Sequence, residues 1–254
     1  MPWSRENVYS QIRSFTMIPS RLARLWSMPV PAKLENGRLI YVDLRSGIGR
    51  HLFMRGKFDP YVFEPFRKTL SEGSIFLDIG ANVGYYSLLA LDYVGQSGSV
   101  HAFEIDPRPL SCFRKTIKKN KVPNLHLHEM AVGKKRCKAI LLQKRDSGLS
   151  SVHSSGEGIE VMTDTLDNLC NSFLKGTVSG IKVDVEGGEL MVLQGAERIL
   201  QDDRPVIVLE AEEEHANRYG YKLDDIFYFL KTLNYEYKWL KDTWDMTIVA
   251  TPRR

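Results

Sequence analysis

The sequence has few cysteines and no long stretch that is free of charged residues. The three cysteines, Cys112, Cys137 and Cys170, lie 25 and 33 residues apart, which excludes zinc knuckles and redox CxxC pairs and argues against a disulfide framework. The longest run without Asp, Glu, Lys or Arg is the 13 residues from Ile79 to Leu91, shorter than the roughly 18 to 20 residues that span a bilayer. The N-terminus lacks the apolar region of a secretory signal. We therefore expect a cytoplasmic protein with free thiols and no transmembrane segment.

The composition predicts a globular chain with an uneven distribution of charge. Hydrophobic residues make up 43% and charged residues 26% of the 254 residues, which excludes disordered and collagen-like chains. Residues 1–73 carry 12 Lys or Arg against 6 Asp or Glu, whereas residues 74–254 carry 23 against 25. The basic excess therefore lies entirely in the first 73 residues, which excludes a uniformly basic nucleic-acid-binding protein.

Residues 1–73 are predicted to form a separate N-terminal segment. Its first thirty residues are rich in arginine and favour an amphipathic helix, which Pro19 interrupts. We expect this helix to pack on the rest of the chain, and the alternative is a contact with a membrane surface. Asn36-Gly37 between two apolar runs is typical of a β-hairpin, and Asp59-Pro60 is typical of a helix start, with the helix ending at Gly73.

Residues 74–254 alternate between strand and helix patterns, which predicts a doubly wound α/β sheet with helices on both faces. Most of the strands are continuous apolar runs, as expected for parallel strands covered on both sides. The predicted strands are Ile75–Ile79, Ser99–Glu104, Leu125–Met130, Ala139–Gln143, Gly180–Val185, Val206–Glu210, Tyr235–Leu240 and Thr247–Thr251. The predicted helices are Gly84–Tyr93, Pro107–Asn120, Gly188–Leu200 and Leu223–Leu233, and residues 147–158 are expected to be a Ser/Gly-rich loop. A ligand would bind beyond the carboxyl ends of the strands.

The first strand is followed by a glycine-rich turn, Asp78-Ile-Gly80-Ala-Asn82-Val-Gly84. Small residues here allow a sharp turn and a close approach of a ligand to the next helix. The spacing differs from the GxGxxG pattern that binds a pyrophosphate, so it favours a ligand without phosphates. Asp78 is a candidate to bind the ammonium group of an amino-acid moiety.

Glu104 ends the second strand, 20 residues after Gly84. An acid at this position can accept hydrogen bonds from both hydroxyls of a ribose. Together with the turn after the first strand, it favours S-adenosylmethionine over NAD as the cofactor.

A third motif, Asp184-Val-Glu186-Gly-Gly-Glu189, ends the fourth strand. Alternation along an extended segment would place Asp184 and Glu186 on the same side. These carboxylates can bind a sulfonium-bearing cofactor, act as a base, or hold a divalent cation. Glu189 can instead cap the helix that begins beside it.

These motifs resemble those of FkbM-type S-adenosylmethionine-dependent methyltransferases. The blocks FLDIGANVGYYSL, VHAFEIDP, IKVDVEGGELMVLQGAERIL and RPVIVLE follow that family's order over roughly residues 74–210. The resemblance implies a Rossmann-like class I methyltransferase fold with an antiparallel final strand. It also implies methylation of an oxygen, commonly a hydroxyl group of a sugar or secondary metabolite.

The resemblance also implies roles for individual residues. The cofactor would be bound by the turn and the end of the second strand, that is, by Asp78, Gly80, Asn82, Gly84 and Glu104. Its adenine would be flanked by Ile105, Met130 and Ala131. A loop that contains Ser147, Ser150 and Ser151 would close near its methyl group. Asp184 and Glu186 would lie below the transferred methyl group.

The sequence therefore predicts an O-methyltransferase that acts on a small hydroxylated molecule. Asp184, Glu186 and His215 are the candidate catalytic residues, and the choice between a base and a divalent cation stays open. His126 and His128 alternate on a strand as metal ligands do, but without a third ligand we interpret them as structural. One alternative is an RNA or protein methyltransferase that docks through residues 1–73, and another is a catalytically silent adapter. The oligomeric state is left open.

Overall fold

The computed structural model describes residues 28–143, 150–153, 156–173 and 176–253. Its centre is a seven-stranded sheet in the order β12-β13-β11-β10-β3-β4-β5. The strands are β3 (Ile75–Ile79), β4 (Ser99–Phe103), β5 (Leu125–His128), β10 (Val178–Val183), β11 (Val206–Glu210), β12 (Tyr235–Trp239) and β13 (Thr247–Pro252). Strands β5, β4, β3, β10 and β11 are parallel, and β13 is antiparallel to β11. The predicted antiparallel final strand is confirmed.

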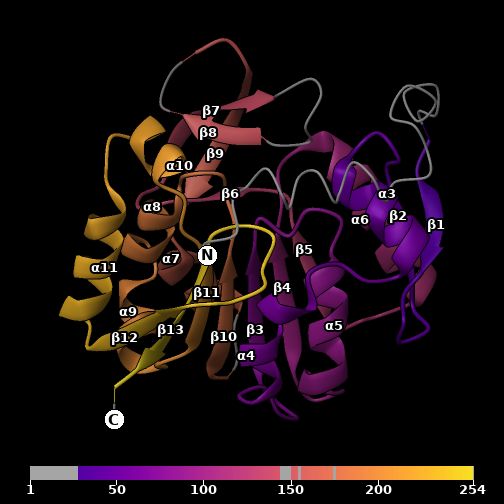
Figure 1. The fold of residues 1–254 in the computed structure, drawn as a ribbon, viewed down its shortest axis with the longest axis horizontal. Helices are drawn as coiled ribbons and strands as arrows, with labels where there is room; N and C mark the ends of the chain where they lie inside the picture. Colours follow the sequence, from indigo (N-terminus) through magenta and orange to yellow (C-terminus); the bar gives the residue numbers. More distant parts are fainter. Residues whose placement is uncertain (1–27, 144–149, 154–155, 174–175, 254) are drawn as a thin grey trace.

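Helices cover both faces of this sheet (Figure 1). On one face, Phe76 belongs to a hydrophobic cluster with residues of α5 (Tyr85–Val94) and α6 (Pro107–Asn120). On the other face, Leu77 belongs to a second cluster, with residues of α7 (Leu166–Phe173), α8 (Glu189–Gln194), α9 (Glu197–Asp202) and α11 (Leu223–Thr232). Adjacent strand residues thus feed two cores because side chains alternate along a strand. The predicted doubly wound α/β fold is confirmed.

A second, four-stranded sheet lies beside the carboxyl ends of the central strands (Figure 1). It has the order β6-β9-β7-β8 and consists of β6 (Ala131–Val132), β7 (Cys137–Gln143), β8 (Ser150–His153) and β9 (Ile159–Asp164). The prediction of a loop throughout residues 147–158 is wrong, because β8 pairs with β7 there. Ser150 Oγ donates to the Asp106 carboxylate, and the hydroxyl of Tyr219 accepts from the backbone N–H of Val152. These bonds attach β8 to segments that follow β4 and β11.

Two predicted helices are shorter than expected. The helix predicted over residues 188–200 is divided into α8 and α9, because Asp167 replaces the helical hydrogen bonds there: its backbone N–H donates to the carbonyl of Gly195, and its carboxylate accepts from the backbone N–H groups of Arg198 and Ile199. The helix predicted from Asp59 to Gly73 is instead a 3₁₀ helix, η1 (Pro60–Val62), followed by α4 (Glu64–Arg67). Pro65 lacks a backbone N–H, so it cannot donate to the carbonyl of Tyr61 and join the two turns into one helix.

Two further short helices were not predicted: α3 (Gly47–Arg55) and α10 (Glu213–Arg218).

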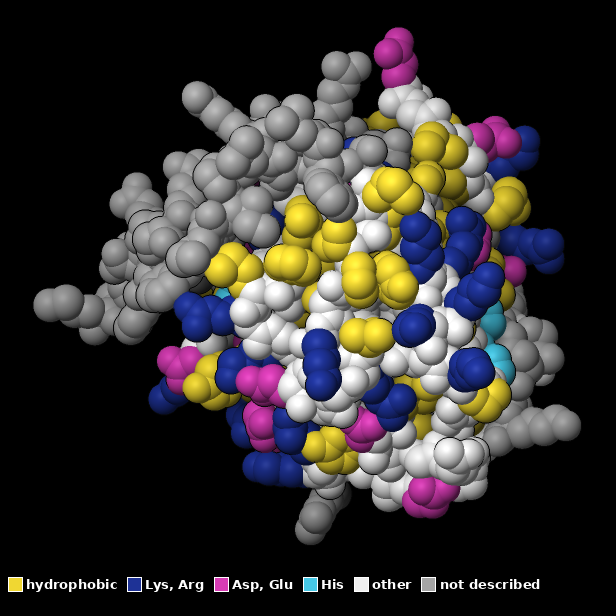
Figure 2. All heavy atoms as spheres, turned by 90° about the vertical axis from the view of Figure 1, so that its right-hand side faces the viewer, with side chains coloured by type: hydrophobic (Ala, Val, Ile, Leu, Met, Phe, Trp, Pro, Cys, Tyr) yellow, Lys and Arg dark blue, Asp and Glu magenta, His cyan; other side chains and the backbone are white. Residues whose placement is uncertain are grey.

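The basic residues of α6 form a solvated helix face, as their spacing with apolar residues predicts. Phe113 is fully buried and Ile117 packs on the same cluster, whereas Arg114 and Lys118 are exposed. On the side of the molecule that carries β1 and β2, Figure 2 shows Lys and Arg side chains scattered between hydrophobic and uncharged ones. They do not join into one continuous basic patch in that view.

The N-terminal segment packs closely on the α/β sheet. The predicted hairpin is present as β1 (Val30–Lys33) and β2 (Leu39–Val42). The backbone N–H of Tyr41 donates to Thr116 Oγ1 of α6 over 2.9 Å, and the Phe66 ring meets Phe76 of β3 edge-on with centroids 4.8 Å apart. Residues 30–73 and the sheet therefore share a hydrophobic core. The helix expected in the first thirty residues lies almost wholly outside the described residues, and the division after residue 73 stays a prediction.

The described residues also bear on the predictions from cysteine and hydropathy. Cys112, Cys137 and Cys170 are free thiols. Among the described residues, no helix is both long and apolar enough to cross a bilayer.

Asp59 connects the N-terminal segment to the loop before β13. Its Oδ2 accepts a 2.6 Å hydrogen bond from the backbone N–H of Trp244, and the ring of Trp244 packs on those of His51 and Phe58. Asp59 is buried, and its Oδ1 has no hydrogen-bond partner among the described residues. Burial raises the pKa of Asp59 to about 6, although hydrogen bonds from the backbone of Trp244, Tyr61 and Val62 partly oppose this effect.

This carboxyl group should make the folded chain less stable as the pH rises. A carboxyl with a higher pKa in the folded chain than in the unfolded chain (about 3.9) binds its proton more tightly when folded, so the free energy of unfolding falls between about pH 4 and 6. A difference of two pKa units corresponds to at most about 3 kcal/mol. We expect Asp59→Asn to remove this loss, so that the variant is more stable than wild type near pH 8 but not near pH 4. Urea denaturation of wild type and variant at both pH values measures the two free energies of unfolding.

The exposed Asp202 provides the control for this experiment. Asp202→Asn should leave the pH dependence of the free energy of unfolding as in wild type. Equal pH dependence in wild type and Asp59→Asn would show that Asp59 is not the group responsible.

Candidate active site

The turn after β3 has a backbone that requires glycine. Gly80, Asn82 and Gly84 have positive φ angles of 78°, 52° and 85°. A Cβ at Gly80 would stand 1.8 Å from the carbonyl oxygen of Asp184, and one at Gly84 would enter the ring of Phe113. Gly80 thus lets the turn touch the end of β10, and Gly84 lets α5 pack against α6. The turn predicted from the sequence is present at the switch point between β3 and β10, where ligands bind in doubly wound folds.

Glu104 lies beside this turn, immediately after β4. Its Oε2 accepts from the backbone N–H of Asn82 over 2.8 Å, and its Oε1 accepts from those of Ile105 and Asp106 over 2.6 and 2.7 Å. Burial raises the pKa of Glu104, and these three N–H groups oppose that effect. The structure therefore brings Glu104, Asn82 and Ile105 together, with the carboxylate held by backbone donors. Its contact with a ribose stays a prediction.

The other residues predicted near the adenine are placed less directly. Met130 is half-buried against the second hydrophobic cluster, and Ala131 belongs to β6, where it pairs with Thr163. Both follow β5, at the same edge of the sheet as Glu104. Ser147 lies outside the described residues.

Asp78 lies beneath the turn, paired with a buried lysine. Its side chain is fully buried, its Oδ2 accepts from Ser87 Oγ over 2.5 Å, and its Oδ1 is 4.0 Å from Lys182 Nζ. Lys182 Nζ also donates to Asp184 Oδ2 over 3.0 Å and lies 5.2 Å from the ring centre of Tyr86. Burial lowers the pKa of Lys182, but Asp184 and Asp78 more than offset this, so its pKa is raised. Asp78 faces the protein interior here, and its contact with an ammonium group stays a prediction.

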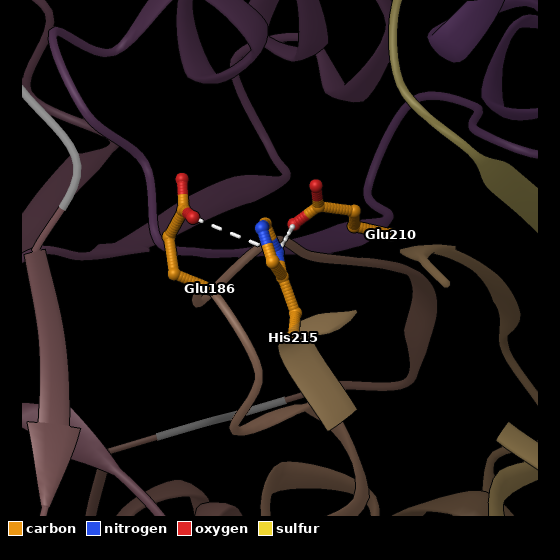
Figure 3. Close-up of side chains that lie close together, drawn as sticks. All are labelled: Glu186, Glu210 and His215. Atoms are coloured by element: carbon orange, nitrogen blue, oxygen red, sulfur yellow. Dashed lines mark ion pairs between the residues drawn. The ribbon is translucent and has the colours of Figure 1, made fainter. Parts of the chain in front are cut away.

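Three side chains from three segments converge beside Asp184: Glu186, Glu210 and His215, hereafter the carboxylate–imidazole cluster (Figure 3). Glu186 follows β10, Glu210 ends β11, and His215 belongs to α10. His215 Nδ1 lies 3.6 Å from Glu186 Oε2 and 3.4 Å from Glu210 Oε2, and the ring lies between the two carboxylates (Figure 3). The structure thus brings together two of the predicted catalytic residues, Glu186 and His215.

The carboxylates of the cluster repel one another in a buried setting. Burial, followed by the negative charges of Glu210 and Asp184, raises the pKa of Glu186 to about 8. Burial and the charge of Asp184 raise the pKa of Glu210 well above its ordinary value. Both groups therefore differ strongly from surface carboxylates, which is typical of functional sites.

The turn from Asp184 to Glu189 differs from the extended segment that the sequence predicted. Strand β10 ends at Val183, and Glu186 has a φ angle of 60°, so simple alternation does not relate Asp184 to Glu186. Glu189 Oε1 accepts from the backbone N–H groups of Val185 and Gly187, both over 3.1 Å. Glu189 therefore holds the turn in place, in agreement with its interpretation as a structural residue.

A small cleft, about 30 Å³ in volume and open to solvent, lies along the carboxyl ends of β10 and β11. Asp184 and Glu210 line it, together with Asp59, Tyr86 and Lys182. Sequence reasoning missed Lys182 and Glu210. Lys182 could have been identified as a charged residue within an otherwise apolar strand. Glu210 could have been identified, as Glu104 and Asp184 were, as an acid at the carboxyl end of a parallel strand.

The close contact at Gly80 can be tested by substitution. Gly80→Ala places a methyl group against the Asp184 carbonyl in a left-handed backbone conformation, so we expect the free energy of unfolding to fall by at least about 3 kcal/mol. Gly37→Ala is the matched control, because Gly37 has a φ angle of 84° but open space around its Cβ position, and its cost should be about 1 kcal/mol. Urea denaturation measures both. Equal losses in the two variants would contradict the contact.

The sequence matches a known protein family. A sequence model of the methyltransferase FkbM domain matches residues 78–237, more than half of the chain. The matched range begins at Asp78 and includes the turn after β3, Glu104 and the carboxylate–imidazole cluster. No curated protein matches the sequence.

Solved structures are similar to this chain at low sequence identity. A methyltransferase FkbM from Methylobacillus flagellatus KT superposes with a TM-score of 0.54 and 16% identity, over 96% of this chain and 58% of that one. The chain therefore spans little more than half of that protein's length. Two further structures superpose with lower TM-scores. The first is a precorrin-6y C5,15-methyltransferase from Geobacter metallireducens GS-15, with a TM-score of 0.46 and 18% identity over 76% of this chain and 86% of that one. The second is fibrillarin from Aeropyrum pernix with bound S-adenosyl-L-methionine, with a TM-score of 0.48 and 12% identity over 89% of this chain and 100% of that one. By its sequence match, the chain belongs to the methyltransferase FkbM domain family.

Proposed function

We propose that this protein is an S-adenosylmethionine-dependent O-methyltransferase that methylates a hydroxyl group of a small molecule, such as a sugar or secondary metabolite. The observation that carries the proposal is the meeting of three features at one edge of the sheet of an FkbM domain. These features are the turn over residues 80–84, the carboxylate of Glu104 and the carboxylate–imidazole cluster.

The residues at this edge fit the proposed cofactor. The turn offers backbone rather than side chains to a ligand, and Glu104 keeps lone pairs that can accept from ribose hydroxyls. Asp78 is fully buried beneath the turn and its Oδ1 is paired with Lys182, so its proposed role is to support the turn that holds the cofactor. Gly80, Asn82, Gly84 and Glu104 would hold the cofactor, with Ile105, Met130, Ala131 and Ser147 around its adenine and methyl group.

When bound, S-adenosylmethionine supplies a methyl group on a positively charged sulfur, and its transfer to a hydroxyl oxygen leaves one proton to be removed. The protein has to align the acceptor oxygen, since proximity supplies much of the rate of such a displacement. Asp184, Glu186 and His215 are the groups proposed to take the proton. The raised pKa of Glu186, about 8, is near working pH, which matches the requirement for a general base.

Loss of the Glu104 carboxylate should weaken cofactor binding. We expect Glu104→Ala to lower the affinity for S-adenosylhomocysteine by roughly 100-fold, because hydrogen bonds to a charged group are lost. Glu104→Gln keeps one acceptor oxygen and the size of the side chain, so its affinity for S-adenosylhomocysteine should fall less than that of Glu104→Ala. Isothermal titration measures both affinities.

An exposed acid provides the control for this titration. Glu160 lies on the outer surface of β9, paired with Lys138, and Glu160→Ala should bind S-adenosylhomocysteine as wild type does. No binding by wild type, or undiminished binding by Glu104→Ala with a wild-type circular dichroism spectrum, would contradict the proposed cofactor. Methyl transfer from labelled cofactor to a panel of hydroxylated acceptors tests the reaction itself.

A further inference from the structure

The carboxylate–imidazole cluster has more acceptor atoms than the described residues can satisfy. Glu186 Oε2, Glu210 Oε2 and His215 Nδ1 are buried, and none has a hydrogen-bond partner among the described residues. The Glu210 side chain is only 8% exposed, and those of Glu186 and His215 are 15% exposed. Buried polar atoms are normally hydrogen-bonded, so three such atoms facing one another indicate that a further group belongs between them.

The distances fit ligands around a metal ion better than a hydrogen bond. The Nδ1 atom of His215 is 3.4 Å from Glu210 Oε2 and 3.6 Å from Glu186 Oε2, and each of the three side chains offers one ligand atom within 4.8 Å of those of the others. Ligands about 2.1 Å from an ion lie about 3.4 Å apart in a tetrahedral site and about 3.0 Å apart in an octahedral one. The observed distances are close to the tetrahedral value and longer than the usual 2.7–3.2 Å of an N–H···O hydrogen bond.

The other nitrogen of the imidazole has a suitable neighbour. His215 Nε2 lies 3.8 Å from Glu212 Oε2, on the side of the ring opposite Nδ1. Histidines that bind a metal through one nitrogen commonly direct the other toward a carboxylate, which fixes the ring and makes it a better ligand. Glu212 is therefore placed to orient His215.

We propose that Glu186, Glu210 and His215 bind a divalent first-row transition metal ion. Two carboxylates and one imidazole suit Mn²⁺, Fe²⁺ or Zn²⁺, whereas Mg²⁺ and Ca²⁺ prefer oxygen ligands alone. A bound cation would also neutralise the buried carboxylates of Glu186 and Glu210. The nearby lysine, Lys182, is already paired with Asp78 and Asp184.

This inference refines the proposed function and rests on it for its role in catalysis. Glu210 also lines the cleft next to Asp184, so an ion held by Glu210 lies at the edge of that cleft. A metal lowers the pKa of an oxygen bound to it and so prepares a hydroxyl for methylation. In that case His215 and Glu186 are ligands, and Asp184, whose side chain is 43% exposed, is the group left to receive the proton. Acceptors with two neighbouring oxygens would be favoured, since both can bind one ion.

Titration of the full chain with Mn²⁺, followed by electron paramagnetic resonance, tests the site. We expect one bound ion in wild type, and roughly 100-fold or greater loss of affinity in His215→Ala and Glu210→Gln. Glu212→Gln, which removes the charge beside the imidazole but none of the proposed ligands, should lower the affinity for Mn²⁺ about tenfold. His126→Ala is the control, because His126 is an exposed histidine of β5, and its affinity should equal that of wild type.

A second readout guards against variants that fail to fold. Pulsed electron paramagnetic resonance of the wild-type Mn²⁺ complex should show coupling of the ion to an imidazole nitrogen. This coupling should be absent in the variant His215→Gln. Failure of wild type to bind Mn²⁺, or an unchanged affinity in His215→Ala and Glu210→Gln, would overturn the metal site. Binding of S-adenosylhomocysteine is measured on the same samples: normal binding without Mn²⁺ binding rejects only the metal site, and the reverse result rejects only the proposed cofactor.

Discussion

The contact between the turn after β3 and the end of β10 determines the geometry of the candidate site. The backbone N–H of Asp184 donates to the carbonyl of Ile79 over 3.0 Å, and Gly80 lies directly against the Asp184 carbonyl. Any side chain at residue 80 would force these two strands apart at their carboxyl ends. This closeness sets the proposed cofactor turn beside the carboxylates that follow β10, so the proposed methyl donor and the groups proposed to act on the acceptor are neighbours.

A buried lysine makes this concentration of acids possible. Lys182 stands on β10 with its charge shared between Asp78 and Asp184, and its ring contact with Tyr86 further stabilises a buried cation. Removing one partner of a buried ion pair leaves an uncompensated charge, which is strongly destabilising. Lys182 therefore pairs with one carboxylate in the interior, that of Asp78, and with one in the cleft, that of Asp184. It compensates Asp78 and Asp184, while Glu186 and Glu210 lie farther along the same edge and have the imidazole of His215 between them.

The sequence predicted those parts of the fold that depend on local patterns. Strand β11 and helix α6 have the predicted bounds, because β11 is a short apolar run and α6 begins after Asp106, whose side chain accepts from the N–H of Arg108. The division of α8 from α9 was not predictable, since it depends on hydrogen bonds that Asp167, almost thirty residues earlier in the chain, makes with the end of one helix and the start of the next. In the site, the turn and Glu104 follow from spacing along the chain. The partnership of Glu210 with His215 does not, because it depends on where the six residues of α10 lie in space.

The distribution of charge has a different meaning once the fold is known. Residues 30–73 share their core with α5, α6 and β3, and Asp59 accepts a hydrogen bond from the loop before β13, so this described part of the basic segment is packed on the sheet. Asp59, Tyr86 and Asp184 line one cleft, which means that this segment forms a wall of the candidate site. We therefore propose that residues 30–73 contribute to function first through the shape of the cleft. Binding of an anionic partner to its outer surface would be a separate property, and the scattered basic side chains of Figure 2 do not favour it.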